Sequence, residues 1–281
     1  MSQSKQQILA LLAEAQVHPR HRFGQHFMID QNLVRAVAAA GQPSPGDLVL
    51  EVGPGTGTLT EELLASGADV LAVEIDRDMA ALLRTRLGDR PNFSLMQADA
   101  LSSKHALDAR LFTRIRHALD AGRAVKLIAN LPYNLASPLI VELLRAGLPT
   151  LAFTVQREVA QRLRAAPGTE DYGALSVVVR LLGRVRILRT LPPQAFWPAP
   201  AVESALVRID RDDRLGTSAE RFSRFVAGLF SSRRKTLRKG LELMGHNGDE
   251  LLSAAGIDGR LRPEQLTPEL HLRLFSHASA A

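Results

Sequence analysis

Short apolar runs alternate with amphipathic segments along most of the chain. The apolar runs have the length of buried strands and lie at 48–52, 70–75, 93–96, 124–129 and 151–155. Segments with apolar residues at helical spacing lie between and after them, at 58–66, 78–87, 138–145 and 158–164. Two later runs, 185–190 and 205–209, are joined by a proline-rich loop and could form an antiparallel edge. The pattern predicts an α/β fold with a mostly parallel sheet covered by helices on both faces.

Both ends of the chain depart from this alternation. Residues 1–19 have the pattern of a short amphipathic helix, and they lack the charged start and the cleavage site of a secretory signal. Residues 211–218 are polar and contain a glycine, as linkers do, and only helical patterns follow from Glu220 onward. We therefore predict three parts: a helical extension (1–20), an α/β domain (21–210) and a small all-α domain (211–281).

The composition excludes several classes of protein and of functional site. The chain has 281 residues, of which 46% are hydrophobic and 23% are charged, as expected of a globular protein. It contains no cysteine, which excludes disulfide bridges, thiolate metal sites and a cysteine nucleophile, and we expect no bound metal. No apolar run approaches the ~18 residues of a membrane span. We expect a cytoplasmic protein without a membrane partner.

The charge is consistent with a nucleic-acid partner. The formal net charge is +6 and the isoelectric point is about 10.2. Almost all cations are arginine, since lysine occurs only at positions 5, 104, 126, 235 and 239. Arginine prefers bidentate contacts to phosphate, so nucleic acid is an allowed partner. Genomic base composition can also replace lysine by arginine, so the charge alone does not decide.

A glycine-rich loop follows the first strand and precedes a helix. Gly53, Gly55 and Gly57 let the backbone turn tightly and approach a ligand closely. A dinucleotide fingerprint would place glycine where Thr58 stands, and Pro54 removes an amide that a pyrophosphate could use. The loop therefore suits a small carboxylate or amino group better than a diphosphate. A tight strand–helix turn without a ligand is the alternative.

Two acidic residues follow the next strands. Glu74 ends the second strand, where a carboxylate can accept hydrogen bonds from both hydroxyls of a ribose. Asp99 follows the third strand, and its carboxylate can accept a hydrogen from an adenine amino group. Open α/β sheets bind ligands at this edge. A solvated strand-end charge and a turn cap are the respective alternatives, and Asp76 competes with Glu74 for the ribose.

The sequence Asn-Leu-Pro-Tyr ends the fourth strand and is the most specific signal. Pro132 pushes Leu131 into an extended conformation, which can direct the Leu131 carbonyl into the cleft. Together with the side-chain oxygen of Asn130 it makes two fixed acceptors beside the flat ring of Tyr133. Such acceptors can hold the exocyclic amine of a stacked base and favour a more nucleophilic nitrogen. The motif could also be a plain strand-to-turn connection.

Two further segments fit a nucleic-acid substrate. The proline-rich stretch 196–204 carries Phe196, which could close the second face of a flipped base; Trp197 competes for that role, and a hydrophobic plug is the alternative. The run 230–239 is predicted as a helix. Its basic residues could contact RNA, or they could simply form a solvated face of the helix. It carries five cations and no acid, namely Arg233, Arg234, Lys235, Arg238 and Lys239. The missing acid favours the RNA contact.

In this order the motifs resemble those of the S-adenosylmethionine-dependent rRNA adenine N6,N6-dimethyltransferases, from about Arg22 to the C-terminus. The segments that carry the resemblance are 22–27 (Arg-Phe-Gly-Gln-His-Phe), 51–57, 130–133, 196–204 and 230–237. The resemblance implies the Rossmann-like sheet of class I methyltransferases and S-adenosylmethionine as cofactor. It also implies 16S rRNA in the immature 30S subunit as partner, with two adjacent adenosines of the 3′-terminal hairpin as targets. We expect a monomer.

The resemblance also assigns roles to residues. The loop with Gly53 and Gly55 would hold the methionine end of the cofactor, Glu74 its ribose and Asp99 its adenine. Asn130 would contact both the cofactor and the target amine, which attacks the sulfonium methyl in line.

One segment departs from the family pattern. His26 and Met28 lie in a stretch that would fold over the cofactor, and the family usually has asparagine and leucine there. Histidine adds a titratable ring. We predict a modestly altered cofactor affinity with activity retained.

Other functions remain open. A 23S rRNA adenine N6-methyltransferase of the antibiotic-resistance type shares the first domain, but the arginine-rich segment and the long C-terminal part argue against it. The chain could also act mainly as a non-catalytic ribosome-assembly factor, although the intact glycine loop and the Asn-Leu-Pro-Tyr motif argue against idle chemistry. A nicotinamide-linked oxidoreductase is disfavoured by Thr58.

Overall fold

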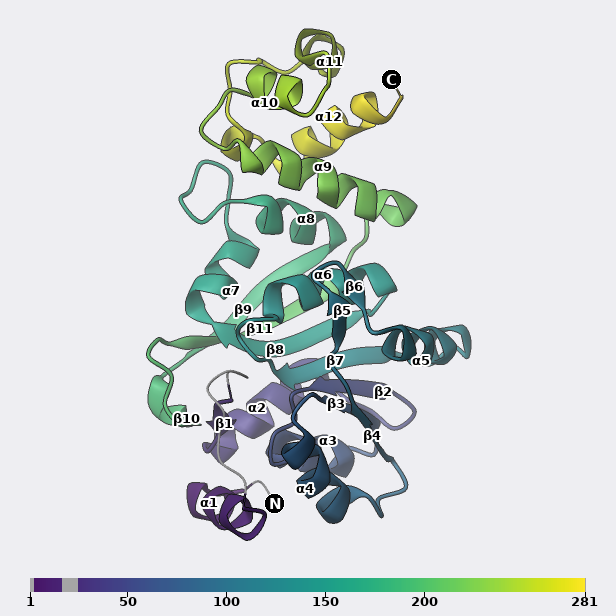
Figure 1. The fold of residues 1–281 in the computed structure, drawn as a ribbon, viewed down its shortest axis with the longest axis vertical. Helices are drawn as coiled ribbons and strands as arrows, with labels where there is room; N and C mark the ends of the chain where they lie inside the picture. The colour runs from purple at the N-terminus through teal and green to yellow at the C-terminus, as the bar shows by residue number, and fades with distance from the viewer. Residues whose placement is uncertain (1–2, 17–24, 281) are drawn as a thin grey trace. The chain divides into compact units, whose positions relative to one another are not determined.

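Strands and helices alternate through the first part of the chain, as the apolar pattern predicts (Figure 1). The structure, a computed structural model, describes residues 3–16 and 25–280. The strands of the large sheet are β2 (Leu48–Val52), β3 (Asp69–Glu74), β4 (Phe93–Gln97), β7 (Val125–Asn130), β8 (Thr150–Gln156), β9 (Gly183–Leu191) and β11 (Ser204–Arg211). Every predicted strand coincides with one of these, with ends that differ by two residues or less.

The large sheet has seven strands in the order β4-β3-β2-β7-β8-β11-β9. Strands β4, β3, β2, β7 and β8 are parallel, whereas β11 runs antiparallel to β8 with Ser204 opposite Gln156. The predicted mostly parallel α/β sheet with an antiparallel edge is therefore confirmed. Because β2 lies between β3 and β7, successive connections leave it in opposite directions, and a crevice opens at the carboxyl ends of these strands.

The described helices include three that were not predicted, α2, α5 and α8. The helices are α1 (Lys5–Glu14), α2 (Gln31–Gly41), α3 (Thr58–Ala65), α4 (Arg77–Leu87), α5 (Ala109–Asp120), α6 (Ala136–Ala146), α7 (Arg157–Arg164), α8 (Ala174–Leu182), α9 (Ala219–Ser231), α10 (Leu237–Leu243), α11 (Gly248–Ala255) and α12 (Pro268–Ala280). Two small sheets add β1 (Phe27–Met28) with β10 (Phe196–Trp197), and β5 (Leu101–Ser103) with β6 (Ala106–Leu107). None of the helices within residues 3–16 and 25–280 has the length and apolarity needed to cross a membrane.

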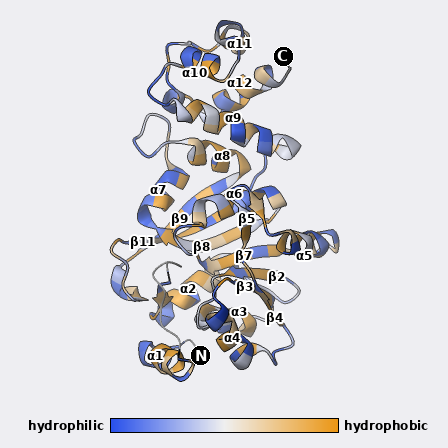
Figure 2. Ribbon diagram, viewed as in Figure 1, coloured by the Kyte–Doolittle hydropathy of each residue, from blue (hydrophilic) through white to orange (hydrophobic). Residues whose placement is uncertain are grey.

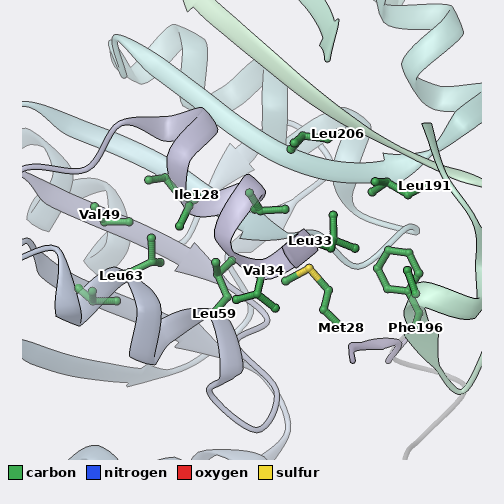
Figure 3. Close-up of a cluster of buried hydrophobic side chains, with 14 of the residues drawn as sticks. Met28, Leu33, Val34, Val49, Leu59, Leu63, Ile128, Leu191, Phe196 and Leu206 are labelled. Carbon is green, nitrogen blue, oxygen red and sulfur yellow. The ribbon is translucent and has the colours of Figure 1, made fainter. Parts of the chain in front are cut away.

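A buried apolar cluster joins α2 and α3 to the sheet. Leu33 of α2 and Leu63 of α3 meet Val49 of β2 and Ile128 of β7 (Figure 3). The contact is close, since a Cβ atom added to Gly41 would lie 2.3 Å from Ile128. Figure 2 shows hydrophobic residues along β2 and α2 and hydrophilic residues over much of α5. This packing fixes the strand ends that carry the predicted site.

The predicted N-terminal amphipathic helix is confirmed as α1. Ser4 and Gln7 form a capping box at its start, and Ser4 accepts a hydrogen bond from the amide of Gln7. Ile8 and Leu12 are buried in a small cluster that also contains Phe27. The helix thus packs close to the segment that carries His26 and Met28. Arg22, Phe23 and Gly24 of the N-terminal motif lie outside the described residues.

The chain folds as two compact units. The first comprises Met1–Ala160 and Arg186–Arg211, and the second comprises Gln161–Val185 and Asp212–Ala281. In the second unit α8 packs against α9 and α12, which explains why residues before β9 group with the C-terminal helices. The division into 1–20, 21–210 and 211–281 stays a prediction.

Candidate active site

A cleft lies at the carboxyl ends of β4, β3, β2 and β7 in the first unit. All the residues predicted to bind the cofactor line it, namely His26, Met28, Gly53, Gly55, Glu74, Asp99 and Asn130. They come from the N-terminal segment and from the ends of four different strands. The sheet topology is what brings them together.

The glycine loop depends on backbone conformations that other residues rarely adopt. Gly53 and Gly55 have φ angles of 72° and 59°, in the left-handed region. A Cβ atom on Gly55 would lie 2.8 Å from the ring of Phe27, so the N-terminal segment lies close against the loop. The expected need for glycine at both positions is confirmed.

Two buried carboxylates stand in the cleft. Burial raises the pKa of Glu51 to about 8, although its side chain accepts a hydrogen bond from the Thr60 hydroxyl at 2.6 Å. Burial likewise raises the pKa of Glu74 to about 7, against the opposing effect of the backbone amides of Asp76 and Gly55. Glu51 was not predicted as a site residue, although its place directly before the glycine loop was a usable signal.

The structure separates Glu74 from its competitor Asp76. Glu74 lines the cleft, whereas the Asp76 side chain accepts a hydrogen bond from the amide of Asp78 at 3.0 Å and caps α4. Asp99 is exposed at the cleft edge, and one of its oxygens accepts a hydrogen bond from the Leu101 amide at 2.9 Å. A carboxylate has further acceptor sites, so this turn contact leaves Asp99 able to accept from a ligand.

The side chain of Asn130 is held at both ends. Its Nδ2 donates to the carbonyl of His26 at 2.7 Å, and its Oδ1 accepts from the hydroxyl of Thr154. The amide of Leu131 donates to the carbonyl of Thr154 at 3.3 Å. In the described part of the chain no group donates to the Leu131 carbonyl. Thr154 was not predicted as a site residue, because nothing near it in the sequence connects it to the motif.

Tyr133 lies against His26 beside the cleft. The two rings are stacked with centroids 5.3 Å apart and planes inclined by 28°. His26 Nδ1 is 2.7 Å from the carbonyl of Pro198, which can only accept, so Nδ1 carries the proton. The Tyr133 hydroxyl is 2.8 Å from that of Ser204, and burial raises the pKa of this tyrosine. His26 thus connects the N-terminal segment to both Tyr133 and the 196–204 stretch.

Phe196 lies apart from this group. Its side chain is 2% exposed in the apolar cluster with Met28 and Leu191 (Figure 3). The pairing of β1 with β10, which sets Met28 opposite Phe196, turns the ring inward. The ring therefore has no open face for a base, and the placement does not support the expected stacking role. The alternative interpretation, that Phe196 fills a hydrophobic space in the core, describes its placement better.

The basic run of the second unit is not a continuous helix, which corrects the prediction. Helix α9 ends at Ser231, and α10 begins at Leu237 behind the cap residue Thr236, so Arg233, Arg234 and Lys235 lie in the intervening turn. Acidic partners are also present; Glu242 lies just beyond the run, and the other two come from more distant parts of the sequence.

Three of the five cations are paired in this way. Arg238 lies 2.8 Å from Asp249, Lys239 lies 3.0 Å from Glu242, and Arg233 lies 4.0 Å from Glu264. Arg234 and Lys235 are exposed and form no ion pair with the described residues.

The architecture defines the class of protein. Solved structures with this fold include the 23S rRNA methyltransferase ErmE, with a TM-score of 0.62 and 27% identity over 90% of this chain and 99% of that one. A dimethyladenosine transferase from Plasmodium falciparum has a TM-score of 0.69 and 22% identity over 91% of this chain and 98% of its own. The first unit is the Rossmann-like sheet of a class I S-adenosylmethionine-dependent methyltransferase.

Sequence comparison identifies the family. Residues 17–279 match the family described as ribosomal RNA adenine dimethylase. A relative named ribosomal RNA small subunit methyltransferase A, from Pseudomonas savastanoi pv. phaseolicola, is 40% identical over 261 residues, which are 91% of this chain and 92% of the relative. Its namesake from Deinococcus radiodurans is 40% identical over 279 residues, 99% of this chain and 90% of the relative. The chain belongs to the ribosomal RNA adenine dimethylase family, and it is an S-adenosylmethionine-dependent rRNA methyltransferase.

Proposed function

We propose that this protein dimethylates N6 of two adjacent adenosines in the 3′-terminal hairpin of 16S rRNA, within the immature 30S subunit. The observation that carries the proposal is the Asn130 side chain, fixed at the edge of the cofactor cleft in a chain of this family. Relatives at 40% identity that carry the small-subunit name support the choice of substrate. A 30S substrate places the enzyme in the cytoplasm, where it would contribute to small-subunit biogenesis as a monomer.

The cleft fits S-adenosylmethionine. Its acceptors are spaced along the strand ends, with Glu74 for the ribose hydroxyls and Asp99 for the adenine amine. The loop at Gly53 and Gly55 lets the backbone approach the methionine end closely. No cluster of three or more potential metal ligands occurs among residues 3–16 and 25–280. When bound, the cofactor supplies an electrophilic methyl group.

Asn130 and Leu131 would hold the target amine. The Asn130 oxygen has a second lone pair beyond the one that Thr154 occupies, and the Leu131 carbonyl has no donor in the described structure. Both can accept the two hydrogens of N6 and hold its lone pair toward the methyl carbon. Held in this way, N6 would form its bond to the methyl carbon as the carbon–sulfur bond of the cofactor breaks in line; the electron pair of that bond would stay on sulfur, and N6 would release a proton to solvent. A second round adds the second methyl group.

Aromatic stacking would orient the base. Tyr133 has a ring held at its hydroxyl by Ser204, and His26 covers one of its faces. The adenine would then stack on the face of Tyr133 that His26 does not cover, or take the place of the His26 ring. Arg234 and Lys235 in the second unit are exposed cations that fit phosphate contacts elsewhere on the RNA.

Single-turnover methyl transfer tests the proposal. Undermethylated 30S particles are mixed with excess enzyme and tritiated cofactor, and Asn130→Ala is compared with the wild type. We expect the Asn130→Ala rate to fall by about a hundredfold or more, while the affinity for the cofactor falls by less. Asn32→Ala, a change at an exposed residue of α2, is the matched control and should keep the wild-type rate. A normal rate in Asn130→Ala would remove the amine-holding role.

A 23S target is the second candidate, because the ErmE structure covers 90% of this chain at 27% identity. Mapping the modified nucleotides separates the two. Methylation of naked 23S rRNA with 30S particles left unmodified would establish the second candidate and exclude the first.

A further inference from the structure

Thr154 stands behind Asn130 and has no contact with the cleft. It lies on β8 directly opposite Asn130 in the parallel pairing of β7 and β8. Its side chain is fully buried, and it is absent from the cleft wall. Its hydroxyl donates to the Oδ1 atom of Asn130. Because this buried hydroxyl donates its hydrogen bond to Asn130, it can fix the orientation of the Asn130 side chain.

The hydrogen bonds fix which way the Asn130 amide points. The His26 carbonyl can only accept, so the atom 2.7 Å away from it must be the NH2 group. The Oδ1 atom then faces Thr154, which must donate. This assignment leaves one lone pair on Oδ1 and one hydrogen on Nδ2 for groups in the cleft. Without the hydroxyl, only the His26 contact would oppose rotation of the amide about its last torsion.

The backbone of the same residue also contacts Leu131, the residue that carries the second proposed acceptor. The backbone carbonyl of Thr154 accepts from the amide of Leu131 at 3.3 Å, which fixes the peptide that precedes the proposed acceptor, the Leu131 carbonyl. The two residues that carry the proposed acceptors, Asn130 and Leu131, therefore both form hydrogen bonds with Thr154 of β8. A side-chain substitution at this position removes the hold on Oδ1 and leaves the backbone contact in place.

We propose that Thr154 is a positioning residue for methyl transfer, which orients the Asn130 oxygen toward the target amine through its hydroxyl. This inference rests on the proposed function of the site. Because Thr154 touches neither ligand, its loss should reduce the rate of the chemical step and leave both binding steps nearly unchanged.

Three variants of the full chain test it. Thr154→Val removes the hydroxyl at nearly constant volume, Thr154→Ser keeps the hydroxyl and removes the methyl, and Thr150→Val makes the same change at the far end of the same strand. We expect kcat on 30S particles to fall about tenfold in Thr154→Val, with KM for the cofactor and for 30S within about twofold of the wild type. Thr154→Ser and Thr150→Val should keep kcat within about twofold.

Two kinetic outcomes would overturn the proposal. One is an unchanged kcat in Thr154→Val. The other is an equal loss in the valine and serine variants, which would show that packing matters and the hydroxyl does not.

A second measurement is independent of activity. In the NMR spectrum the side-chain amide protons of Asn130 should exchange slowly with water in the wild type and in Thr154→Ser, and at least about tenfold faster in Thr154→Val. Equal exchange in all three would also overturn the positioning role. If the wild-type enzyme did not methylate 30S particles, the proposed function would fail, while the exchange measurement would still report on the Asn130–Thr154 contact.

Discussion

Gly53 and Pro132 lie close together in the wall of the cleft, although they belong to different motifs. A Cβ atom on Gly53 would lie 3.0 Å from the Cγ atom of Pro132, which is closer than ordinary packing allows. The loop proposed to hold the methionine end of the cofactor is thus fitted directly to the segment proposed to hold the target amine. A substitution in the glycine loop should therefore disturb the Asn-Leu-Pro-Tyr segment, and the reverse should also hold.

Gly53→Ala should weaken cofactor binding. Gly122→Ala is the matched control, because both glycines have similar positive φ angles, 72° and 75°, and nothing lies within 4 Å of a Cβ on Gly122. In each variant the unfavourable backbone conformation alone should lower the free energy of unfolding by about 1 kcal/mol. Only Gly53→Ala should also lose about tenfold or more in affinity for S-adenosylmethionine, measured by calorimetry. Equal affinities in the two variants would contradict the fit between loop and motif.

Cofactor binding should depend on pH through Glu51 and Glu74. Burial raises their pKa values to about 8 and about 7, so both carry protons in much of the free enzyme at neutral pH. A sulfonium charge and ribose hydroxyls that donate hydrogen bonds favour the ionised carboxylates. Binding should therefore release protons, and affinity should increase between about pH 6 and about pH 8.

Calorimetry in two buffers with different ionisation heats measures the released protons. Glu51→Gln should release fewer protons than the wild type. No release from the wild type at pH 7 would refute this account of the two carboxylates.

His26→Asn should change cofactor affinity modestly and keep the enzyme active. The histidine ring contacts Pro198 and Tyr133, while its backbone carbonyl, which the substitution keeps, accepts from Asn130. Titration calorimetry should show a shift of about two- to fivefold in affinity. An unchanged affinity would count against any role of the His26 side chain.

Cations of the second unit should contribute unequally to RNA binding. Arg234 and Lys235 have no ion pair among the described residues, whereas Arg238 is 2.8 Å from Asp249. Arg234→Ala and Lys235→Ala should each weaken 30S binding and reduce the salt dependence by about one phosphate contact. Arg238→Ala should have a smaller effect. Equal effects of all three would show that local pairing does not matter.

His271 should make the second unit sensitive to acid. Burial lowers its pKa from 6.5 to about 4, and neither ring nitrogen has a hydrogen-bond partner among the described groups. The unfolded chain binds the proton more readily, so this contribution to stability is present above pH 6.5 and is lost as the pH falls toward 4. The wild type should lose about 2 kcal/mol more than His271→Leu between pH 7.5 and pH 5 in urea unfolding. The same pH dependence in both proteins would exclude this role.

The sheet and the cleft were predictable because their signals are local. Strands such as Leu48–Val52 are apolar throughout, and the glycine loop and Asn130 sit at strand ends, where topology alone gathers them. Helix α8 was not predicted because Val177, Val178 and Val179 are β-branched, and their helical conformation depends on packing against α9 and α12.

The missed or misplaced site residues depend on contacts between distant parts of the chain. Phe196 turns inward because β10 pairs with β1, and Thr154 meets Asn130 through the pairing of β7 with β8. The run 230–239 lacks acids in sequence, but Asp249 and Glu264 reach it in the fold. Of the acidic partners only Glu242, three positions after Lys239, is close in sequence. The other contacts join positions more than ten residues apart, so no local pattern reveals them.

The proposed activity places two methyl groups on each of two neighbouring adenosines of 16S rRNA. The most direct measurement incubates purified enzyme and S-adenosylmethionine with 30S particles that lack the modification, and then analyses nuclease fragments of the 16S rRNA by mass spectrometry. We predict that the 3′-terminal hairpin fragment gains four methyl groups, two on each adenosine, and that particles without enzyme gain none. An unmodified hairpin, with methyl groups found on another RNA or on none, would contradict the account.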